Sequence, residues 1–163
     1  GWWYFAPLSG GRCVCMFMTD ADLVTARARS PLDGWNERMQ RTLHVRSCLD
    51  AYPALEAFTV CTARSQRLDR MSGPRWIAVG DAAMAFDPLS SRGITKSVEH
   101  GCRAAGAVLE YLEGDDAALE RLADRFAQEF GDYEQMRRAY YSTERRWADA
   151  PFWQRRQVQE TVS

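Results

Sequence analysis

The stretch WIAVGDAAMAFDPLSSRGITK, residues 76–96, carries most of the information about fold and function in this sequence. Residues 76–80 are continuously apolar, which is typical of a short strand covered on both faces. A tight acidic turn follows at Asp81, then a loop that contains Pro88, and Gly93 marks the start of a helix. This order of strand, loop and helix predicts a ligand site, because ligands in α/β sheets bind beyond the carboxyl ends of strands.

Side-chain size and backbone charge favour a binding site in the same segment. Gly80 has no side chain, so a ligand or another backbone can approach it closely. Asp81 can accept hydrogen bonds from sugar-like hydroxyls. Gly93 and Ile94 place backbone N–H groups at a helix N-terminus, where partial positive charge favours an anion or an electron-rich carbonyl. The helix dipole stabilises such a group by about 0.3–1 kcal/mol when the group is exposed and by up to about 2 kcal/mol when it is partly buried.

The Gly80-Asp81-Ala82-Ala83 element, followed by Pro88 and Gly93-Ile94, resembles the second flavin-binding motif of FAD-dependent aromatic hydroxylases and flavin-dependent halogenases. The resemblance implies FAD as the cofactor, with Asp81 bound to a ribityl hydroxyl. It places Pro88 beside the isoalloxazine ring, and the N–H groups of Gly93 and Ile94 at its pyrimidine edge. The expected cofactor-binding residues are Gly80, Asp81, Pro88, Gly93 and Ile94. No catalytic acid or base stands out, and the catalytic residues stay unassigned.

Both ends of the chain extend this resemblance. Residues 1–8 (GWWYFAPL), 17–22 (FMTDAD) and 144–156 (ERRWADAPFWQRR) resemble tryptophan-halogenase-like flavoproteins. Among these, the chain is most similar to the group that hydroxylates side chains of partner proteins during quinone-cofactor maturation. The implied fold class is α+β, with part of the FAD/NAD(P)-binding fold of the aromatic-hydroxylase type. Residues 1–75 are then part of a substrate-binding domain, and residues 76–163 are the C-terminal part of the FAD-binding domain plus a helical tail.

The N-terminal half predicts a β-hairpin followed by a helix. Residues 2–6 and 12–19 are aromatic-rich and apolar, and the turn-forming residues 7–11 separate them. A helix is expected to begin with Ser30 as N-cap and Pro31 at its first position, and to end at Tyr52-Pro53. Residues 58–68 are expected to be extended.

Two long helices are predicted after the flavin-like segment. The first runs from about Ile94 to Glu113, and Gly114-Asp115-Asp116 ends it. We expect its interior face to carry Ile94, Val98, Ala105, Val108 and Leu112. Apolar residues at helical spacing define the second helix, namely Leu119, Leu122, Phe126, Phe130, Tyr133, Met136 and Tyr140. Arg92 and Lys96 lie near the motif, and two interpretations are open for them: a solvated helix start, which we expect, or an action on substrate or flavin.

Composition excludes several classes of protein. The chain of 163 residues has 46% apolar residues, 26% charged residues and a formal net charge of -1. This balance does not favour binding to nucleic acid or to an anionic membrane. No apolar run approaches the ~20 residues of a membrane span. The five cysteines include no C-x-x-C pair, and only two histidines are present, so we expect reduced cysteines in a cytoplasmic protein and no metal site.

The first flavin fingerprint, G-x-G-x-x-G, is absent from the sequence. Since the family carries it upstream, and the chain opens on a strand-like run without an initiator Met, we expect the chain to start inside a larger protein. A sheet that lacks its other strands leaves apolar surface and an open edge. We therefore expect the isolated chain to bind FAD weakly or not at all.

The leading functional hypothesis is a portion of an FAD-dependent oxidoreductase, a monooxygenase that transfers oxygen to an aromatic small molecule or a protein side chain. It would be inactive without the missing N-terminal dinucleotide-binding half. The alternatives are a flavin-dependent halogenase fragment, a split flavoprotein whose first half is another polypeptide, and a truncated, non-catalytic homologue. In the last case the chain would act as an interaction module, with a homodimer as its assembly.

Overall fold

The computed structural model describes residues 1–24, 29–52 and 57–157, and the chain divides into two compact units. Unit 1 consists of Gly1–Cys61 and Glu144–Ser163, and unit 2 of Thr62–Thr143. The structure combines helices with short strands, which confirms the α+β class. No helix within the described ranges has both the length and the apolar character needed to span a bilayer.

Unit 1 opens with the predicted hairpin. Strands β1 (Trp2–Leu8) and β2 (Arg12–Met18) pair antiparallel, from Trp2 opposite Met18 to Leu8 opposite Arg12. The turn contains a short 3-10 segment, η1 (Ser9–Gly11), in which Gly10 and Gly11 have φ of 73° and 69°. This left-handed backbone explains the Gly-Gly pair, because side chains with a Cβ are disfavoured there.

Short helices complete unit 1, and the helix cap at Ser30 is confirmed. The Ser30 hydroxyl accepts a hydrogen bond from the Asp33 N–H at 3.1 Å, and Pro31 is the first helical residue. The predicted single helix is wrong in its length: it ends at Gln40, and a separate helix begins at His44. Its expected end at Pro53 lies outside the described residues. The helices are α1 (Ala21–Val24), α2 (Pro31–Gln40), α3 (His44–Leu49) and α6 (Pro151–Gln157).

Ion pairs attach α6 to the residues that follow the hairpin. Arg155 donates to Asp20 at 2.8 Å and to both carboxylate oxygens of Asp22 at 2.8 and 2.7 Å. Arg156 donates to Asp20 at 2.7 Å. The acidic residues at the start of α1, Asp20 and Asp22, therefore hold a segment more than 130 positions away in the sequence.

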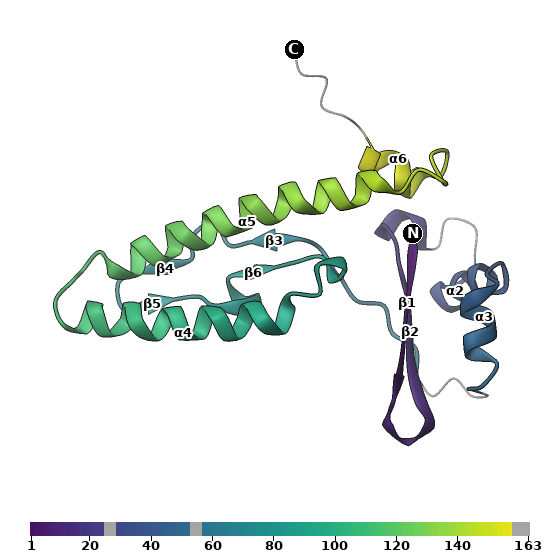
Figure 1. The fold of residues 1–163 in the computed structure, drawn as a ribbon, viewed down its shortest axis with the longest axis horizontal. Coiled ribbons are helices and arrows are strands. Elements are labelled where there is room, and N and C mark those ends of the chain that lie inside the picture. The colour runs from purple at the N-terminus through teal and green to yellow at the C-terminus, as the bar shows by residue number, and fades with distance from the viewer. Residues whose placement is uncertain (25–28, 53–56, 158–163) are drawn as a thin grey trace, which may run out of the picture. The chain divides into compact units, whose positions relative to one another are not determined.

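Unit 2 contains the two long predicted helices with short strands between them (Figure 1). The helices pack against each other as a hairpin, and Gly114 (φ 105°) follows the first. The strands form two antiparallel pairs, β3 with β6 and β4 with β5. The elements are β3 (Gln66–Arg67), β4 (Ser72–Gly73), β5 (Trp76–Ile77), η2 (Gly80–Ala82), β6 (Met84–Ala85), η3 (Pro88–Ser90), α4 (Gly93–Leu112) and α5 (Ala118–Thr143).

One strand prediction is wrong in extent. The expected buried strand over residues 76–80 is regular only at Trp76–Ile77, where it forms a tight hairpin with β4, and Trp76 is 43% exposed. One further bond, from the Ala78 N–H to the Met71 carbonyl at 2.8 Å, prolongs the pairing. Of residues 58–68, which were expected to be extended, Gln66–Arg67 pairs with β6, and a bond from the Leu68 N–H to the Ala83 carbonyl at 2.9 Å prolongs the pairing.

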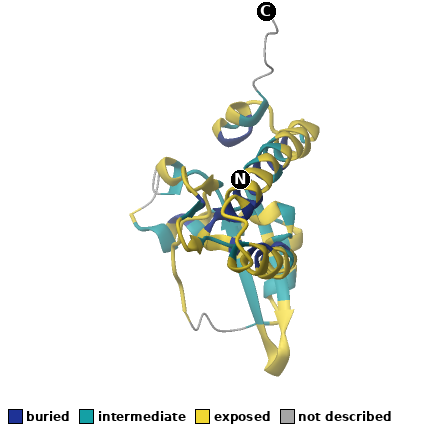
Figure 2. Cartoon of the chain, turned by 90° about the vertical axis from the view of Figure 1, so that its left-hand side faces the viewer, coloured by how far each residue is buried: buried dark blue, intermediate teal, exposed yellow. Residues whose placement is uncertain are grey.

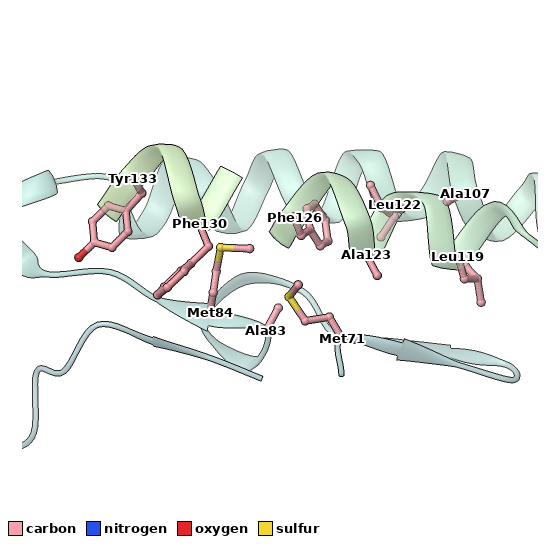
Figure 3. Packing of buried hydrophobic residues seen from close by; sticks show 11 residues of the cluster. Met71, Ala83, Met84, Ala107, Leu119, Leu122, Ala123, Phe126, Phe130 and Tyr133 are labelled. Carbon is pink, nitrogen blue, oxygen red and sulfur yellow. The ribbon is translucent and has the colours of Figure 1, made fainter. Parts of the chain in front are cut away.

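The core of unit 2 lies between α5 and the short strands (Figure 3). Phe126 and Leu122 of α5 are fully buried. They face Met71, which precedes β4, and Ala83 and Met84, which lie at the start of β6. This core packs directly against the Gly80 turn, because Ala83 and Met84, which belong to the core, immediately follow that turn.

The expected interior face of α4 is wrong. Ile94 is 85% exposed and Leu112 is 74% exposed, whereas Lys96 and His100 are fully buried. At about 100° per residue, Lys96 lies about 200° further round the helix than Ile94, on a different face. Exposed residues, in yellow, alternate along the helices with buried residues in dark blue (Figure 2).

Candidate functional site

The turn at Gly80 is built around a left-handed residue. Gly80 has φ of 58° and is buried, and a Cβ added to it would lie 2.9 Å from the Ser97 hydroxyl oxygen. Ser97 belongs to the second turn of α4, so the turn and the helix approach each other closely at this point. Both the backbone conformation and the lack of space therefore favour glycine here.

A buried histidine holds this turn. The Gly80 N–H donates to Nδ1 of His100 at 3.2 Å, so the neutral imidazole carries its proton on Nε2. Nε2 then donates to Oε2 of Glu129 at 3.3 Å, and the ring stacks on Phe126 with 3.9 Å between centroids. Burial lowers the pKa of His100 below its ordinary value, an effect that Glu129 partly offsets. The neutral form that the Gly80 bond requires is thus the form that the site favours.

Asp81 lies on the surface, and a buried lysine binds its carboxylate. Its Oδ1 accepts a hydrogen bond from the Lys96 ammonium at 2.7 Å; the Lys96 side chain is fully buried, whereas that of Asp81 is 74% exposed. Lys96 also donates to the Met84 carbonyl, and its Nζ lies 4.5 Å from the centroid of the Phe86 ring. The expectation of a solvated Lys96 is therefore wrong. The Asp81 carboxylate, the Met84 carbonyl and the Phe86 ring take the place of the water molecules that would surround an exposed ammonium group.

Arg92, the other cation expected in a solvated helix start, belongs to a network of ion pairs at the N-terminal end of α4. Its side chain is 38% exposed, and it contacts Glu99 at 3.5 Å and Glu129 at 3.4 Å. Glu129 also accepts from Arg103 at 3.1 Å. The carboxylate that orients His100 is thus itself in contact with two arginines, one at the N-cap of α4 and one within the helix.

The loop that carries Pro88 is fixed by tyrosines of α5. Asp87 caps η3 by accepting the Leu89 N–H at 2.9 Å. The Asp87 N–H donates to the Tyr133 hydroxyl at 2.6 Å, and the Tyr141 hydroxyl donates to Oδ2 of Asp87 at 2.9 Å. Pro88 itself is exposed, so the loop presents it on an anchored segment.

The N-terminus of α4 is open around Gly93. Apart from Gly93 itself, its two chain neighbours and the nearby backbone of α4, no heavy atom of the described residues lies within 4 Å of the position that a Gly93 Cβ would occupy, and Ile94 is 85% exposed. Arg92 is the N-cap residue, and its side chain makes no capping hydrogen bond. The first N–H groups of a 20-residue helix lack intrahelical partners, so this end offers donors to a ligand.

The structure brings the turn and the helix start together. Gly80 and Asp81 contact the first two turns of α4 through Ser97 and Lys96, and the anchored η3 loop leads directly into Gly93. Sequence reasoning missed the supporting residues Lys96, His100, Glu129, Tyr133 and Tyr141. One signal was available, since Lys96, His100, Ala104 and Ala107 recur at helical spacing.

Comparisons with known proteins agree on one group of flavoproteins. The sequence model of the tryptophan halogenase family matches residues 1–163. The putative FAD-dependent oxidoreductase LodB of Marinomonas mediterranea is 33% identical over 160 residues, which are 96% of this chain and 42% of LodB. A 1H-pyrrole-2-carbonyl-[peptidyl-carrier protein] brominase of Pseudoalteromonas luteoviolacea is 35% identical over 52 residues, which are 32% of this chain and 13% of the brominase. The chain thus spans less than half the length of either relative, and no solved structure matches it.

Proposed function

Because the chain belongs to the tryptophan halogenase family, we propose that it is part of an FAD-dependent oxidoreductase and contributes the half of the site that holds the ribityl chain and isoalloxazine ring. FAD is the cofactor of this family. The observation that carries the proposal is the pairing of an exposed, anchored carboxylate with an open helix N-terminus, joined through Lys96 of the same helix.

The described residues fit the polyol arm of FAD. A carboxylate has about four lone-pair sites, and Lys96 occupies one of them on Oδ1 of Asp81. With its side chain 74% exposed, Asp81 retains acceptor capacity for a ribityl hydroxyl. Gly80 keeps the turn close to α4, so that this carboxylate remains near the start of the helix.

The start of α4 fits the electron-rich edge of the ring. The N–H groups of Gly93 and Ile94 would donate to the pyrimidine edge, and Pro88 would lie against the ring. Reduced flavin carries negative charge near N1 and C2=O, which the partial positive charge of a helix N-terminus stabilises. When bound, the flavin supplies the redox chemistry, and this chain positions it.

We further propose that residues 1–75 belong to a substrate-binding domain and residues 76–163 to the FAD-binding domain and its helical tail. This functional division differs from the compact units, since residues 62–75 pack within unit 2 and residues 144–157 within unit 1. Aromatic contacts in the first segment supply an apolar scaffold for an aromatic substrate. Trp3 lies 4.8 Å from Phe17 and 5.4 Å from Trp35, measured between ring centroids.

The reaction that we propose is oxygen transfer to an aromatic small molecule or a protein side chain. Its support is the oxidoreductase relative, whose alignment covers 96% of this chain at 33% identity. Halogenation is the second candidate, and the match to a brominase that acts on a carrier-protein-bound pyrrole favours it. The two reactions share the flavin site, so the residues assigned to FAD are the same in both.

The site is tested by titrating the ¹⁵N-labelled chain with FMN, which contains the ring and ribityl arm, and with ADP, which contains neither. We expect FMN to shift the amide signals of Asp81, Gly93 and Ile94, with weak affinity in the range of about 1 mM, or about −4 kcal/mol. ADP is the matched control and should leave them unchanged. The isolated chain should not retain FAD through desalting.

Two outcomes would contradict the proposed function. Amide signals that do not move with FMN at up to several times the expected dissociation constant would exclude the ribityl and ring site. A tight dimer in gel filtration that is indifferent to FMN would instead favour a non-catalytic interaction module. Stoichiometric FAD in the desalted chain would contradict only the expectation of weak binding.

A further inference from the structure

We propose that Lys96 is a positioning residue of the flavin site: from its buried place on α4 it fixes the Asp81 carboxylate so that the exposed oxygen can accept a ribityl hydroxyl. This inference rests on the proposed function and assigns a role to a residue outside the flavin-like motif. Lys96 does not itself touch a ligand, because its side chain is fully buried.

The buried ammonium group is satisfied by the chain alone. Its three N–H donors have a carboxylate oxygen of Asp81 at 2.7 Å, the Met84 carbonyl, and the face of the Phe86 ring 4.5 Å away. Among the described residues, every buried side-chain nitrogen and oxygen has a hydrogen-bond partner. The ammonium of Lys96 is therefore held by contacts within the chain, which favours a positioning role over direct contact with substrate or flavin.

The contacts of Lys96 span the turn that follows Gly80. Asp81 lies at the start of this turn and Met84 at its end, and the ammonium binds both of them from the adjacent helix. A cation at this place thus fixes the turn relative to the N-terminus of α4. The same helix end is the part of the site that would meet the pyrimidine edge of the flavin.

Stability alone does not explain a buried charge at this position. Replacing a buried ion pair by apolar residues of similar volume is often neutral or stabilising, because desolvation offsets the attraction between the charges. The pair is also asymmetric, with one partner fully buried and the other 74% exposed. An exposed carboxylate without this contact would sample several rotamers, and ordering it on binding would weaken the affinity for a polyol.

The test is a double-mutant cycle on FMN affinity in the 163-residue chain, with the variants Lys96→Met, Asp81→Asn and the double variant. We expect Lys96→Met to weaken FMN binding by about 3- to 10-fold, the loss that disordering one side chain produces. In the Asp81→Asn background we expect no further loss, because Lys96 acts only through Asp81. Arg121→Met, which removes an exposed cation of α5, is the matched control and should bind FMN like the wild type.

A second measurement follows Asp81 itself. Side-chain scalar couplings should show one dominant χ1 rotamer of Asp81 in the wild type and averaged rotamers in Lys96→Met, without any flavin present. If Lys96→Met does not fold, Lys96→Gln takes its place, since it keeps N–H donors and removes the charge. We expect Lys96→Gln to lie between the wild type and Lys96→Met in both measurements.

The outcomes separate this inference from the proposed function. No FMN binding by the wild type would overturn both. Wild-type binding with an unchanged affinity in Lys96→Met would overturn the positioning role and leave the flavin site intact. If Lys96→Met caused the same loss in the wild type and in the Asp81→Asn background, the role would also be overturned, because Lys96 would then act on general structure rather than through Asp81.

Discussion

The two faces of α4 contrast in a way that hydrophobicity does not predict. The inner face is buried although half of its residues are polar: Lys96, His100, Ala104 and Ala107. The outer face is exposed although it is apolar: Ile94, Val98, Leu109 and Leu112 are 85%, 62%, 61% and 74% exposed. The same helix therefore buries an ammonium and an imidazole and exposes its largest aliphatic side chains.

Specific partners explain the inner face. A polar group is buried without penalty only when its hydrogen bonds are replaced, and the Gly80 turn and α5 supply those replacements. His100 has Gly80 and Glu129, and Lys96 has Asp81 and Met84. The burial of Lys96 and His100 thus depends on their place at the turn, where these partners are available. The burial of an aliphatic side chain depends only on how much of its surface the neighbouring residues can cover.

The largest expected effect comes from the packing that supports the inner face. Phe126 is fully buried and stacks on His100. We expect Phe126→Ala to lower the free energy of unfolding by about 3–5 kcal/mol, since it creates a cavity under the imidazole. Leu109→Ala on the outer face is the matched control and should change it by less than about 0.5 kcal/mol. Urea unfolding of both variants measures the difference.

Equal losses in Phe126→Ala and Leu109→Ala would contradict the assignment of the two faces. A large loss for Leu109→Ala alone would mean that the outer face is covered in solution. Because Leu109 is 61% exposed in the described chain, that result would require a contact with another molecule.

Gly80→Ala should have the next largest effect. The left-handed backbone at φ 58° is strained for alanine by about 1–2 kcal/mol, and the new Cβ would meet the Ser97 hydroxyl at 2.9 Å. We expect a loss of about 1–3 kcal/mol in the free energy of unfolding. Gly80→Ala combined with Ser97→Ala should recover part of this loss, because it removes the hydroxyl oxygen at 2.9 Å and keeps a good helix former in α4, leaving the backbone strain and a contact of 3.3 Å to the Cβ of residue 97. An unchanged stability in Gly80→Ala would contradict the turn geometry.

Local signals in the sequence were sufficient for the turns and caps. The Ser30-Pro31 cap, the Gly10-Gly11 turn and the end of α4 before Gly114 each depend on the conformation of one or two residues. Such preferences act within a few positions of the chain, so no partner element is needed to predict them. The boundaries of the first long helix followed from the same kind of signal, whereas the second was predicted only from its apolar spacing.

The burial of α4 could not be predicted in this way. Ile94 and Leu112 were expected inside because they are aliphatic and recur at helical spacing, yet Lys96 and His100 occupy the inner face. Their burial depends on groups that are remote in sequence, such as Glu129, which lies 29 positions after His100. The strand at Trp76 was overextended for a similar reason, since its length is limited by the partner strand and not by its own apolar residues.

The protonation of His100 gives a smaller, pH-dependent effect. Its folded-state pKa is lowered by burial, so below its ordinary value of 6.5 the unfolded chain binds a proton that the folded chain excludes. Stability should therefore fall as the pH drops from about 6.5 through the lowered folded-state pKa. Glu129 opposes this trend, whereas the nearby cations Lys96 and Arg103 favour it, so the change should remain below that of Gly80→Ala.

Urea unfolding at pH 7.5 and 5.5 measures this dependence. The difference in unfolding free energy between the two pH values should be smaller in His100→Gln than in the wild type, since glutamine does not titrate. Protonation would also place a proton on Nδ1, which then could no longer accept the Gly80 N–H. A variant and a wild type with the same pH dependence would exclude His100 as its source.

The smallest effect is expected on the outer face and has the opposite sign. Gly101 lies within α4 and is exposed. Apart from its chain neighbours and the backbone of its own helix, no heavy atom of the described residues lies within 4 Å of the position of an added Cβ. Gly101→Ala should raise the free energy of unfolding by about 0.5–1 kcal/mol, because alanine loses less backbone entropy than glycine on entering a helix. Gly106→Ala has the same open surroundings and should behave alike. A loss of stability in Gly101→Ala at high protein concentration, with a gain on dilution, would show that copies of the chain pack closely over this face. The contrast with Gly80→Ala then separates two uses of glycine in one unit: a required conformation at the flavin-like turn, and a replaceable residue on the exposed side of the helix.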